Sequence, residues 1–372
     1  MKKIGITGQN GFIGQHLYNT LGLYPEEFER IEFQKNYFEN PGLLDEFVGK
    51  CDVIVHLAAM NRHESQEIIY QTNIQLVQQL IESLERTNSK AHVLISSSTQ
   101  EEKNNHYGKS KKEGRILLQN WAEKNSGKLT GLIIPNVFGC FGKPFYNSFV
   151  ATFCYQLTHG QTPEIVNDGN VKLIYIQDLV KIIINQIRSE KSNPELFVIP
   201  TSEKKVSEIL ELLKKFKTIY FENGEIPELN NSFEHNLFNT FRAYIDMKNH
   251  FPVLLKKNED PRGVFVEIIR LGIGGQCSFS TTVPGITRGN HYHTRKIERF
   301  AVIKGKALIQ LRKIGTAEVL NYELVGNQPA YVDMPVWYTH NIKNVGEEDL
   351  YTLFWINEPF NPDDPDTYFE EV

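Results

Sequence analysis

A glycine-rich turn near the start of the sequence restricts the possible folds more than any other feature. The turn reads TGQNGFIG and places Gly8, Gly11 and Gly14 at three-residue intervals. It follows the strand-like run KKIGIT and leads into the helix-like run GFIGQHLYNTL. Glycine permits a tight turn and a close approach of backbone to phosphate, and a helix N-terminus offers free N–H groups. The turn predicts a dinucleotide-binding unit; the alternative is a glycine-rich turn without a ligand.

Strand-like and helix-like segments alternate along the first half of the sequence. Apolar runs at 51–59, 91–98 and 129–139 are separated by helical patterns at 72–87 and 106–124. This alternation is typical of a parallel sheet with crossover helices, and near-continuous apolar runs suit strands that are buried on both faces. The first half is therefore expected to form an α/β domain of the Rossmann type.

The pattern changes after about residue 250, where strand-like pieces follow one another without a long helical pattern. These pieces cover residues 264–271, 277–283, 299–314, 317–324, 329–334 and 350–356. Consecutive short strands predict an antiparallel sandwich or barrel. A length of 372 residues also exceeds one typical domain. We therefore expect a first domain over 1–246 and an all-β domain over 247–372.

Charge and composition narrow the class of protein. The formal net charge is −5 and no long basic run occurs, which argues against nucleic acid or an anionic membrane as a partner. No apolar run reaches the roughly 18 residues that a membrane-spanning helix needs, and no signal peptide is evident. Four cysteines occur without paired spacing and are expected to be reduced thiols: Cys51, Cys140, Cys154 and Cys277. A cytoplasmic protein is expected.

A second motif follows the strand-like run at 91–98. The segment SSSTQEEKNNHYGKSKK contains Tyr107 and Lys111, whose i, i+4 spacing puts both side chains on one face of a helix. A lysine ammonium beside a phenol favours the phenolate and is expected to lower the tyrosine pKa from about 10. Such a tyrosine can exchange a proton with a carbonyl oxygen while hydride moves at carbon. Ser98 is placed to hydrogen-bond the same oxygen, and Thr99 is the alternative.

The choice between NAD and NADP is expected to depend on the second strand, within RIEFQKN at 30–36. An acidic residue at the end of this strand would bind a ribose hydroxyl and indicate NAD. Glu32 falls inside the run and Lys35 follows it. A lysine suits a 2′-phosphate, so NADPH is favoured; the alternative is that Lys35 is only solvated.

A group of metal-ligand residues lies far along the chain, in GNHYHTRKIERFAVIKG and PVWYTHNIKN. On a strand, His291 and His293 point to one face, roughly 6–7 Å apart. Glu298 is an odd number of residues from both histidines, so on a continuous strand its side chain would point to the opposite face. Residues 294–297 must therefore turn or bulge to direct Glu298 toward the same centre. With His340, three imidazoles and one carboxylate predict a divalent metal site. Zinc is the first choice, and the ligand set also permits iron, manganese or nickel.

The first 245 residues resemble the extended short-chain dehydrogenase/reductase family. The resemblance rests on TGQNGFIG, HLAA at 56–59, Asn73, the SSS…YGKSK unit and PNVFG at 135–139. It implies action on a nucleotide-linked sugar, with Tyr107 as acid/base, Lys111 on the nicotinamide ribose and Ser98 polarising the substrate. It further implies cofactor contacts from Thr7, Gly8, Gly11, Phe12, Ile13, Gly14, Lys35, Leu57, Ala58 and Lys111, and substrate contacts from Arg62 and Asn136.

Two departures from that family pattern are visible. The gap between Ser98 and Tyr107 is short, so that an intervening loop is missing and one face of the site is expected to be more open. Ile133 stands where family members often have an arginine.

Residues 250–372 resemble the cupins. The first cupin motif is matched by Gly285, His291, His293, Glu298 and Gly305, and the second by Pro335, His340 and Asn344, with Pro329 and Trp337 in place of two glycines. Sugar-modifying cupins move a proton beside a 4-keto group, often without a metal. Tyr292, Tyr338 and Asp333 are candidate bases because they lie near the ligands in sequence.

The fusion of these halves resembles the family of bifunctional capsular polysaccharide synthesis enzymes of the CapF type. The resemblance implies that the cupin half epimerises C3 of a UDP-2-acetamido-2,6-dideoxy-4-hexulose. It implies that the reductase half then reduces the C4 ketone with NADPH to UDP-2-acetamido-2,6-dideoxy-L-talose, a precursor of N-acetyl-L-fucosamine for capsule or O-antigen. A homodimer is expected by the same analogy.

Three alternatives remain open from the sequence. The first is a reductase whose cupin is only structural or substrate-binding. The second is a nucleotide-sensing protein without turnover, and the third is a cupin oxygenase fused to an unrelated reductase.

Overall fold

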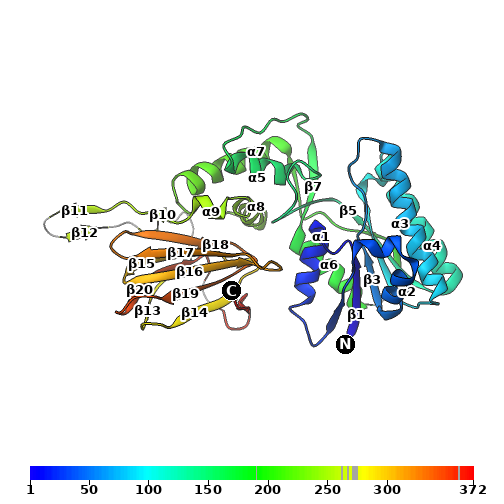
Figure 1. Cartoon of the computed structure of the whole chain (residues 1–372). Coiled ribbons are helices and arrows are strands. Elements are labelled where there is room, and N and C mark those ends of the chain that lie inside the picture. Colours follow the sequence, from blue (N-terminus) through cyan, green and yellow to red (C-terminus); the bar gives the residue numbers. More distant parts are fainter. Residues whose placement is uncertain (190, 261–262, 266–267, 270–274, 359–360) are drawn as a thin grey trace. The chain divides into compact units, whose positions relative to one another are not determined.

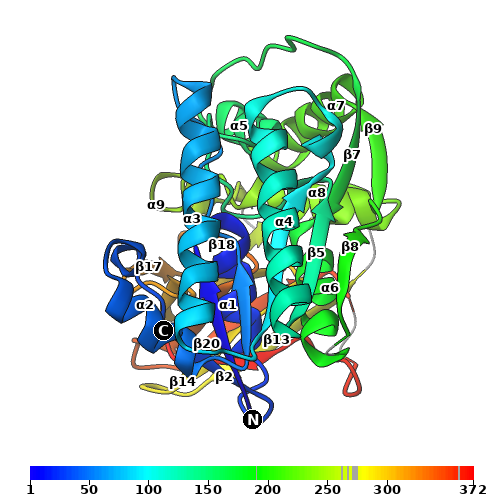
Figure 2. The same ribbon diagram turned by 90° about the vertical axis from the view of Figure 1, so that its right-hand side faces the viewer.

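The computed structural model describes residues 1–189, 191–260, 263–265, 268–269, 275–358 and 361–372 (Figures 1 and 2). The chain divides into two compact units. The first comprises Met1–Thr152 with Val166–Val206, and the second comprises Phe153–Ile165 with Ser207–Val372. The strand expected over 264–271 lies partly outside the described residues.

The first unit contains a six-stranded parallel sheet in the order β2-β1-β3-β4-β5-β8. Its strands are β1 (Lys2–Thr7), β2 (Phe28–Ile31), β3 (Val53–His56), β4 (His92–Ser98), β5 (Lys128–Ile134) and β8 (Asn193–Phe197). β2 and β3 flank β1 on opposite sides, so the strand order reverses at β1. In such sheets ligands bind beyond the carboxyl ends of the strands at this point. The sheet confirms the Rossmann-type expectation.

Helices cover both faces of this sheet: α1 (Phe12–Leu21), α2 (Pro41–Lys50), α3 (Gln66–Arg86), α4 (His106–Asn125) and α6 (Ile176–Ser189). Figure 1 shows α1 and α6 on one side and α2, α3 and α4 on the other. A buried core joins the second group to the sheet through residues such as Phe47, Leu80, Val93 and Trp121. Figure 2 shows α3 and α4 running side by side.

Two strand expectations in this unit need correction. The run at 129–139 is not one strand, because β5 ends before Pro135 and β6 (Asn136–Phe138) joins a separate sheet with β7 (Asn170–Tyr175) and β9 (Ser202–Lys205). Proline has no N–H to donate to a sheet ladder, which accounts for the break.

The second expected strand also ends earlier than residues 30–36 implied. β2 ends at Ile31, and η1 (Lys35–Glu39) is a 3₁₀ helix. Glu32 therefore follows the strand instead of lying within it, and Lys35 begins the 3₁₀ helix.

The second unit contains two five-stranded antiparallel sheets, in the orders β10-β18-β15-β20-β13 and β17-β16-β19-β14-β21. Their strands are β10 (Val253–Leu254), β13 (Gln276–Thr282), β14 (Thr287–Tyr292), β15 (Glu298–Lys304), β16 (Lys306–Lys313), β17 (Val319–Val325), β18 (Ala330–Met334), β19 (Tyr338–Asn344), β20 (Leu350–Ile356) and β21 (Tyr368–Phe369). Two facing antiparallel sheets form the expected cupin jelly roll.

The run expected at 299–314 is two strands, β15 and β16, in different sheets. Gly305 lies between them with a φ of +89°, a backbone conformation that favours glycine. The remaining elements are α5 (Phe149–Thr158), α7 (Val206–Phe216), η3 (Lys217–Glu222), α8 (Ser232–Arg242), α9 (Met247–His250), and the strand pair β11 (Asn258–Asp260) and β12 (Gly263–Phe265). In the described part of the chain, no helix has both the length and the apolar character needed to cross a bilayer.

Candidate active site and metal centre

The glycine turn connects the carboxyl end of β1 to α1. Gly8 has a φ of +76°, and a Cβ atom there would lie 2.9 Å from the backbone nitrogen of Ala58. A Cβ atom at Gly14 would lie 2.3 Å from the carbonyl oxygen of Gly8. Both positions therefore require glycine, because the turn, the helix and the segment after β3 are in direct contact. The N-terminus of α1, which begins at Phe12, lies at the edge where a pyrophosphate is expected.

Side chains fix the ends of β1 and β3 to each other. Thr7 Oγ1 and His56 Nδ1 share a hydrogen bond of 2.8 Å, and the backbone nitrogen of Ala58 donates to the same hydroxyl at 3.4 Å. Burial lowers the pKa of His56 to about 3, with a further contribution from Lys111, so this imidazole is neutral. The expected cofactor residues Thr7, Gly8 and Ala58 thus adjoin one another, whereas Lys35 is exposed in η1.

Ser98, Tyr107 and Lys111 lie where β4 ends and α4 begins. Ser98 is the last residue of β4, and its hydroxyl accepts a hydrogen bond from the backbone nitrogen of Gln100 at 3.2 Å. The Lys111 ammonium lies 6.0 Å from the centre of the Tyr107 ring, and it donates to the carbonyl oxygen of Ser96 at 2.8 Å. The helical spacing therefore puts the tyrosine and the lysine on one face as expected. Thr99 is exposed, and Ser98 is half-buried.

The direction of the Tyr107 pKa shift differs from the expectation. Burial raises this pKa to about 12, and the nearby phenol of Tyr146 adds to the effect. Burial also lowers the pKa of Lys111 to about 8, against the opposing influence of Glu101. The Tyr107 pKa rises because burial is its largest cause, while the Lys111 ammonium stays 6.0 Å from the ring centre and donates to Ser96. At neutral pH Tyr107 therefore keeps its proton, as a proton donor must.

The two residues expected to contact substrate make contacts within the protein. The guanidinium of Arg62 donates to the carbonyl oxygens of Phe145 and Tyr146. The amide of Asn136 donates to the carbonyl oxygen of Lys172 at 3.3 Å. Arg62 therefore fixes the loop that carries Tyr146, while contacts of Arg62 and Asn136 with substrate remain a prediction.

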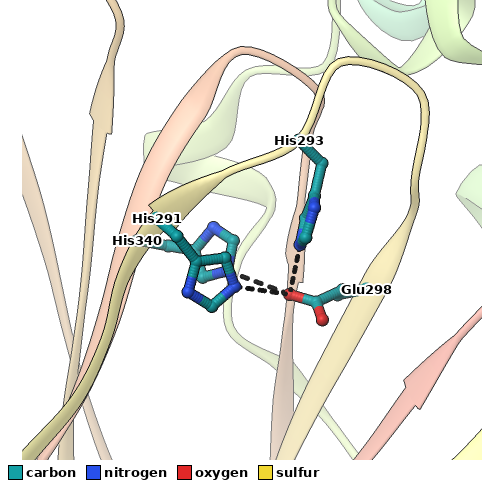
Figure 3. Close-up of side chains that lie close together, drawn as sticks. All are labelled: His291, His293, Glu298 and His340. Carbon is teal, nitrogen blue, oxygen red and sulfur yellow. Dashed lines mark ion pairs between the residues drawn. The ribbon is translucent and has the colours of Figure 1, made fainter. Parts of the chain in front are cut away.

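The four expected metal ligands converge between the two sheets of the cupin (Figure 3). His291 in β14 and His340 in β19 are cross-strand partners, and the strand register shifts between Gly289 and His291. His293 follows β14, and Glu298 begins β15 in the other sheet. The segment between these two residues crosses from one sheet to the other. Glu298 can therefore face the histidines despite its odd spacing from them along the chain.

The geometry of the cluster centres on one carboxylate oxygen. Glu298 Oε2 lies 2.9 Å from Nε2 of His340, 3.2 Å from Nε2 of His293 and 3.9 Å from Nε2 of His291. The side chains of His340, His293 and Glu298 are 0%, 4% and 8% exposed, and that of His291 is 23% exposed. The site is thus buried on three sides and open at His291.

The far nitrogens of two imidazoles determine what the cluster can bind. Nδ1 of His293 is within hydrogen-bond distance of the carbonyl oxygen of Asp366, and Nδ1 of His340 lies 3.2 Å from the carbonyl oxygen of Tyr338. A carbonyl oxygen only accepts, so Nδ1 carries the proton and a neutral ring presents a lone pair at Nε2. Both Nε2 atoms and Glu298 Oε2 are buried without a hydrogen-bond partner. Electron-pair donors that converge in this way fit a metal cation.

The protonation states of the cluster agree with this fit. Burial acts to raise the pKa of Glu298, but the three imidazoles hold that pKa well below its usual range. Burial lowers the pKa of His340, whereas Glu298 raises the pKa of His293 in opposition to burial. Metal binding needs an ionised carboxylate and neutral imidazoles. Because Glu298 raises the His293 pKa, it favours a positive charge at this ring, which is a proton without metal and which a metal cation would replace.

Asp366, which no sequence pattern indicated, holds the segment between two of the candidate ligands. Its carboxylate accepts hydrogen bonds from the backbone nitrogens of Thr294, Arg295 and Lys296 at 3.1, 2.9 and 3.0 Å, and from the Thr294 hydroxyl at 2.6 Å. Its own carbonyl oxygen is the partner of His293 Nδ1. The segment that joins two ligands is therefore fixed by the C-terminal tail. No spacing rule relates Asp366 to His293, because 73 residues separate them.

Replacing Asp366 by alanine should release the segment between His293 and Glu298. Residues that orient metal ligands typically contribute about 10- to 100-fold in affinity, so zinc affinity should fall by that factor. Competition with a chelator of known affinity measures the change. Asp363→Ala is the matched control, since Asp363 is exposed in the same tail. An Asp366→Ala protein that binds zinc as tightly as the control would contradict this role.

The candidate bases occupy different faces of the cupin sheets. Asp333 faces Arg299 across β18 and β15 and bonds its guanidinium at 2.8 Å, on the face opposite to Glu298. Tyr292 adjoins His291 on the strand and so points to the other face, where its ring stacks on Trp337. Tyr338 is two residues from His340 and shares its face. Of the three, Tyr338 is therefore the one on the ligand side.

The fold and site together define a dinucleotide-binding enzyme domain joined to a cupin whose cluster of three histidines and one glutamate could hold a metal ion. The family described as NAD dependent epimerase/dehydratase matches residues 4–199, and the polysaccharide biosynthesis C-terminal domain matches residues 258–368. The chain belongs to the NAD-dependent epimerase/dehydratase family and, with its second domain, to the CapF-like capsular polysaccharide assembling proteins.

Two of the similar proteins span nearly the whole chain, and a third matches part of it. The UDP-2-acetamido-2,6-beta-L-arabino-hexul-4-ose reductase of Pseudomonas aeruginosa is 33% identical over 368 residues, which covers 98% of each chain. The crystal structure of the capsular polysaccharide assembling protein CapF from Staphylococcus aureus is 35% identical and covers 100% of both chains with a TM-score of 0.64. The spore coat polysaccharide biosynthesis protein SpsL of Bacillus subtilis is 28% identical over 124 residues, 30% of this chain and 81% of that protein.

Proposed function

We propose that the chain is a bifunctional nucleotide-sugar enzyme. The cupin half epimerises C3 of a UDP-2-acetamido-2,6-dideoxy-4-hexulose, and the reductase half reduces the C4 ketone to give UDP-2-acetamido-2,6-dideoxy-L-talose. The observation that carries the proposal is the convergence of three imidazoles and a carboxylate in a chain that also has the Tyr107–Lys111 pair. The name of the full-length Pseudomonas relative, a reductase of a UDP-linked 2-acetamido hexul-4-ose, supports the substrate class.

In the reductase half, the residues of β4 and α4 handle the proton. Bound NADPH supplies the hydride for C4. Tyr107, whose pKa is about 12, donates its phenolic proton to the C4 oxygen as that oxygen becomes an alkoxide. The Ser98 hydroxyl hydrogen-bonds the same oxygen, and the Lys111 ammonium stabilises negative charge on the phenolate that remains. The products are the C4 alcohol and an oxidised nicotinamide.

In the cupin half, the 4-ketone makes the C3 proton acidic. A divalent ion, with zinc as our first choice, would be held by His291, His293, Glu298 and His340 and would supply Lewis-acid chemistry next to the ketone. Removal of the C3 proton and its return to the opposite face invert the carbon. Tyr338 lies on the ligand face and is the candidate for moving this proton. Reduction at C4 then ends the acidity of C3 and preserves its new configuration.

The proposal includes a cofactor preference and a cellular setting. Lys35 supports NADPH, whereas Glu32, directly after β2, occupies the place of a ribose-binding acid and makes NADH the competing outcome. The four cysteines are free thiols, which supports a cytoplasmic enzyme. We further propose a homodimer, a role in capsule or O-antigen synthesis, and a division of labour between residues 1–246 and 247–372.

Solvent deuterium distinguishes the two activities. The protein is incubated in deuterated water with a UDP-linked 4-keto-6-deoxy-HexNAc, first without cofactor and then with NADPH or NADH. Deuterium should enter C3 without cofactor, and a new C4 alcohol should form only with the reduced nicotinamide, faster with NADPH. If no deuterium enters C3, the epimerase assignment is wrong. The protein is then a 4-keto reductase with a structural or substrate-binding cupin, an alternative that is supported by the name of the Pseudomonas relative, which describes a reductase alone.

A further inference from the structure

The connection between Ser98 and Tyr107 is short and closely packed. Eight residues, 99–106, join them, and they include the 3₁₀ turn η2 (Thr99–Glu102). A Cβ atom at Gly108 would lie 2.0 Å from the carbonyl oxygen of Gln100, so the first turn of α4 packs directly against η2. Any shift of η2 would therefore displace Tyr107 relative to Ser98.

A buried ion pair holds this connection in place. Glu101 and Arg115 form a bidentate contact, with Nε to Oε1 at 2.9 Å and Nη2 to Oε2 at 2.8 Å. Their side chains are 8% and 3% exposed. The hydroxyl of Ser97, the residue before Ser98, donates to the same carboxylate. Arg115 also donates to the carbonyl oxygen of Pro194 at 3.2 Å. Glu101 thus joins the end of β4, the body of α4 and the start of β8.

The same carboxylate affects the charge of the buried lysine. Lys111 lies about one turn before Arg115 on α4, so that the guanidinium is a charged neighbour of the lysine. In the described part of the chain, the Lys111 ammonium donates to two neutral oxygens of Ser96. Burial favours the uncharged amine, and Glu101 opposes burial by its negative charge. The other ionisable groups that face Lys111 are His56, which is neutral, and the protonated phenol of Tyr107.

We propose that Glu101, held by Arg115, is a positioning residue of the reductase centre: it sets Ser98 relative to Tyr107 across the shortened connection, through an arginine that lies one helical turn from Lys111. The inference rests on the proposed reductase function.

The contribution of this buried ion pair to the free energy of folding does not by itself explain its presence. Replacing a buried ion pair by apolar side chains of similar size is often neutral or stabilising, because two charges lose their hydration. An apolar pair at these two positions would hold η2 against α4, but it would leave Lys111 without an anion. A full carboxylate is therefore explained by its effect on the lysine as well as by its hydrogen bonds.

Three variants separate the effect of charge from that of position. Glu101→Gln keeps the size and removes the charge, Glu101→Asp keeps the charge and shortens the reach, and Glu102→Gln removes an exposed acid from the same turn as control. Reduction and NADPH binding are measured from pH 6 to pH 10. Lys111 must be charged to act, so activity falls as the pH rises through its pKa of about 8. We call this fall of activity at high pH the alkaline limb of the pH profile. In Glu101→Gln the alkaline limb should lie at least about half a pH unit lower than in the native protein.

Glu101→Asp should keep the alkaline limb of the native protein. Its kcat should fall about 10-fold, because the shorter side chain misplaces Ser98 relative to Tyr107. Glu102→Gln should change neither quantity. A purely structural role would lower kcat and thermal stability in Glu101→Gln at every pH without moving the limb, and that result would overturn the inference. If the native protein reduces no 4-keto sugar, the proposed function fails, whereas the limb in NADPH binding still tests the effect of Glu101 on Lys111.

Discussion

The Tyr107→Phe protein is expected to reduce the 4-keto sugar about 10²- to 10⁴-fold more slowly than the native protein, the usual contribution of a general acid. The substitution removes one hydroxyl and keeps the ring, so the packing of the ring is preserved. The phenol with a pKa of about 12 is the proton donor of the proposed reduction, and the C4 alkoxide loses this donor in Tyr107→Phe. Single-turnover oxidation of NADPH measures the chemical step directly.

Two further measurements make this test specific. NADPH affinity should be unchanged in Tyr107→Phe, because the glycine turn and Lys111 are intact. Deuterium should still enter C3 at the native rate, because the cupin ligands belong to another site. Tyr70→Phe is the matched control, since Tyr70 lies on α3 and its phenol bonds Glu113. A Tyr107→Phe protein with native reduction would remove the residue from the mechanism and leave another proton donor to be found.

The sequence predicts the local geometry of the N-terminal candidate residues because that geometry depends on neighbours in sequence. The glycine turn needs Gly8 and Gly14 for contacts that the strand–turn–helix order implies, and the i, i+4 rule alone brings Tyr107 and Lys111 to one face. The direction of the tyrosine pKa shift is not local. It depends on burial and on Tyr146, which is 39 positions away in the sequence, so a pairwise argument from Lys111 gives the wrong sign.

The same distinction applies to the cupin. The spacing of His291, His293, Glu298 and His340 predicts the ligand cluster, and the odd spacing of Glu298 from the first two histidines correctly predicts that the chain must turn before it. Asp366 holds that turn but comes from the far end of the chain, and Glu101 holds the reductase connection through Arg115. Sequence patterns within one strand or helix do not reveal such partners, because hydrogen bonds between distant segments depend on the tertiary fold.

The substitution Glu298→Gln is expected to abolish metal binding and C3 exchange together. Glutamine has nearly the same size, but it lacks the negative charge on which the three imidazoles converge, at 2.9, 3.2 and 3.9 Å. Loss of a direct ligand should exceed the roughly 10- to 100-fold effect of residues that only orient ligands. We therefore expect zinc affinity and solvent deuterium uptake at C3 each to fall by more than about 100-fold. Elemental analysis after dialysis measures the metal content independently of activity.

The control for this substitution is Glu323→Gln, an exposed acid on β17. It should keep both the metal and C3 exchange, and both variants should bind NADPH like the native protein. Separate readouts matter because the cluster can serve two purposes. A Glu298→Gln protein that loses its metal but still exchanges C3 would make the ion structural and assign the chemistry to side chains such as Tyr338. A Glu298→Gln protein that keeps its metal at native affinity would instead show that the three imidazoles suffice for metal binding. The carboxylate would then contribute no binding energy, and its burial among the imidazoles would need another cause.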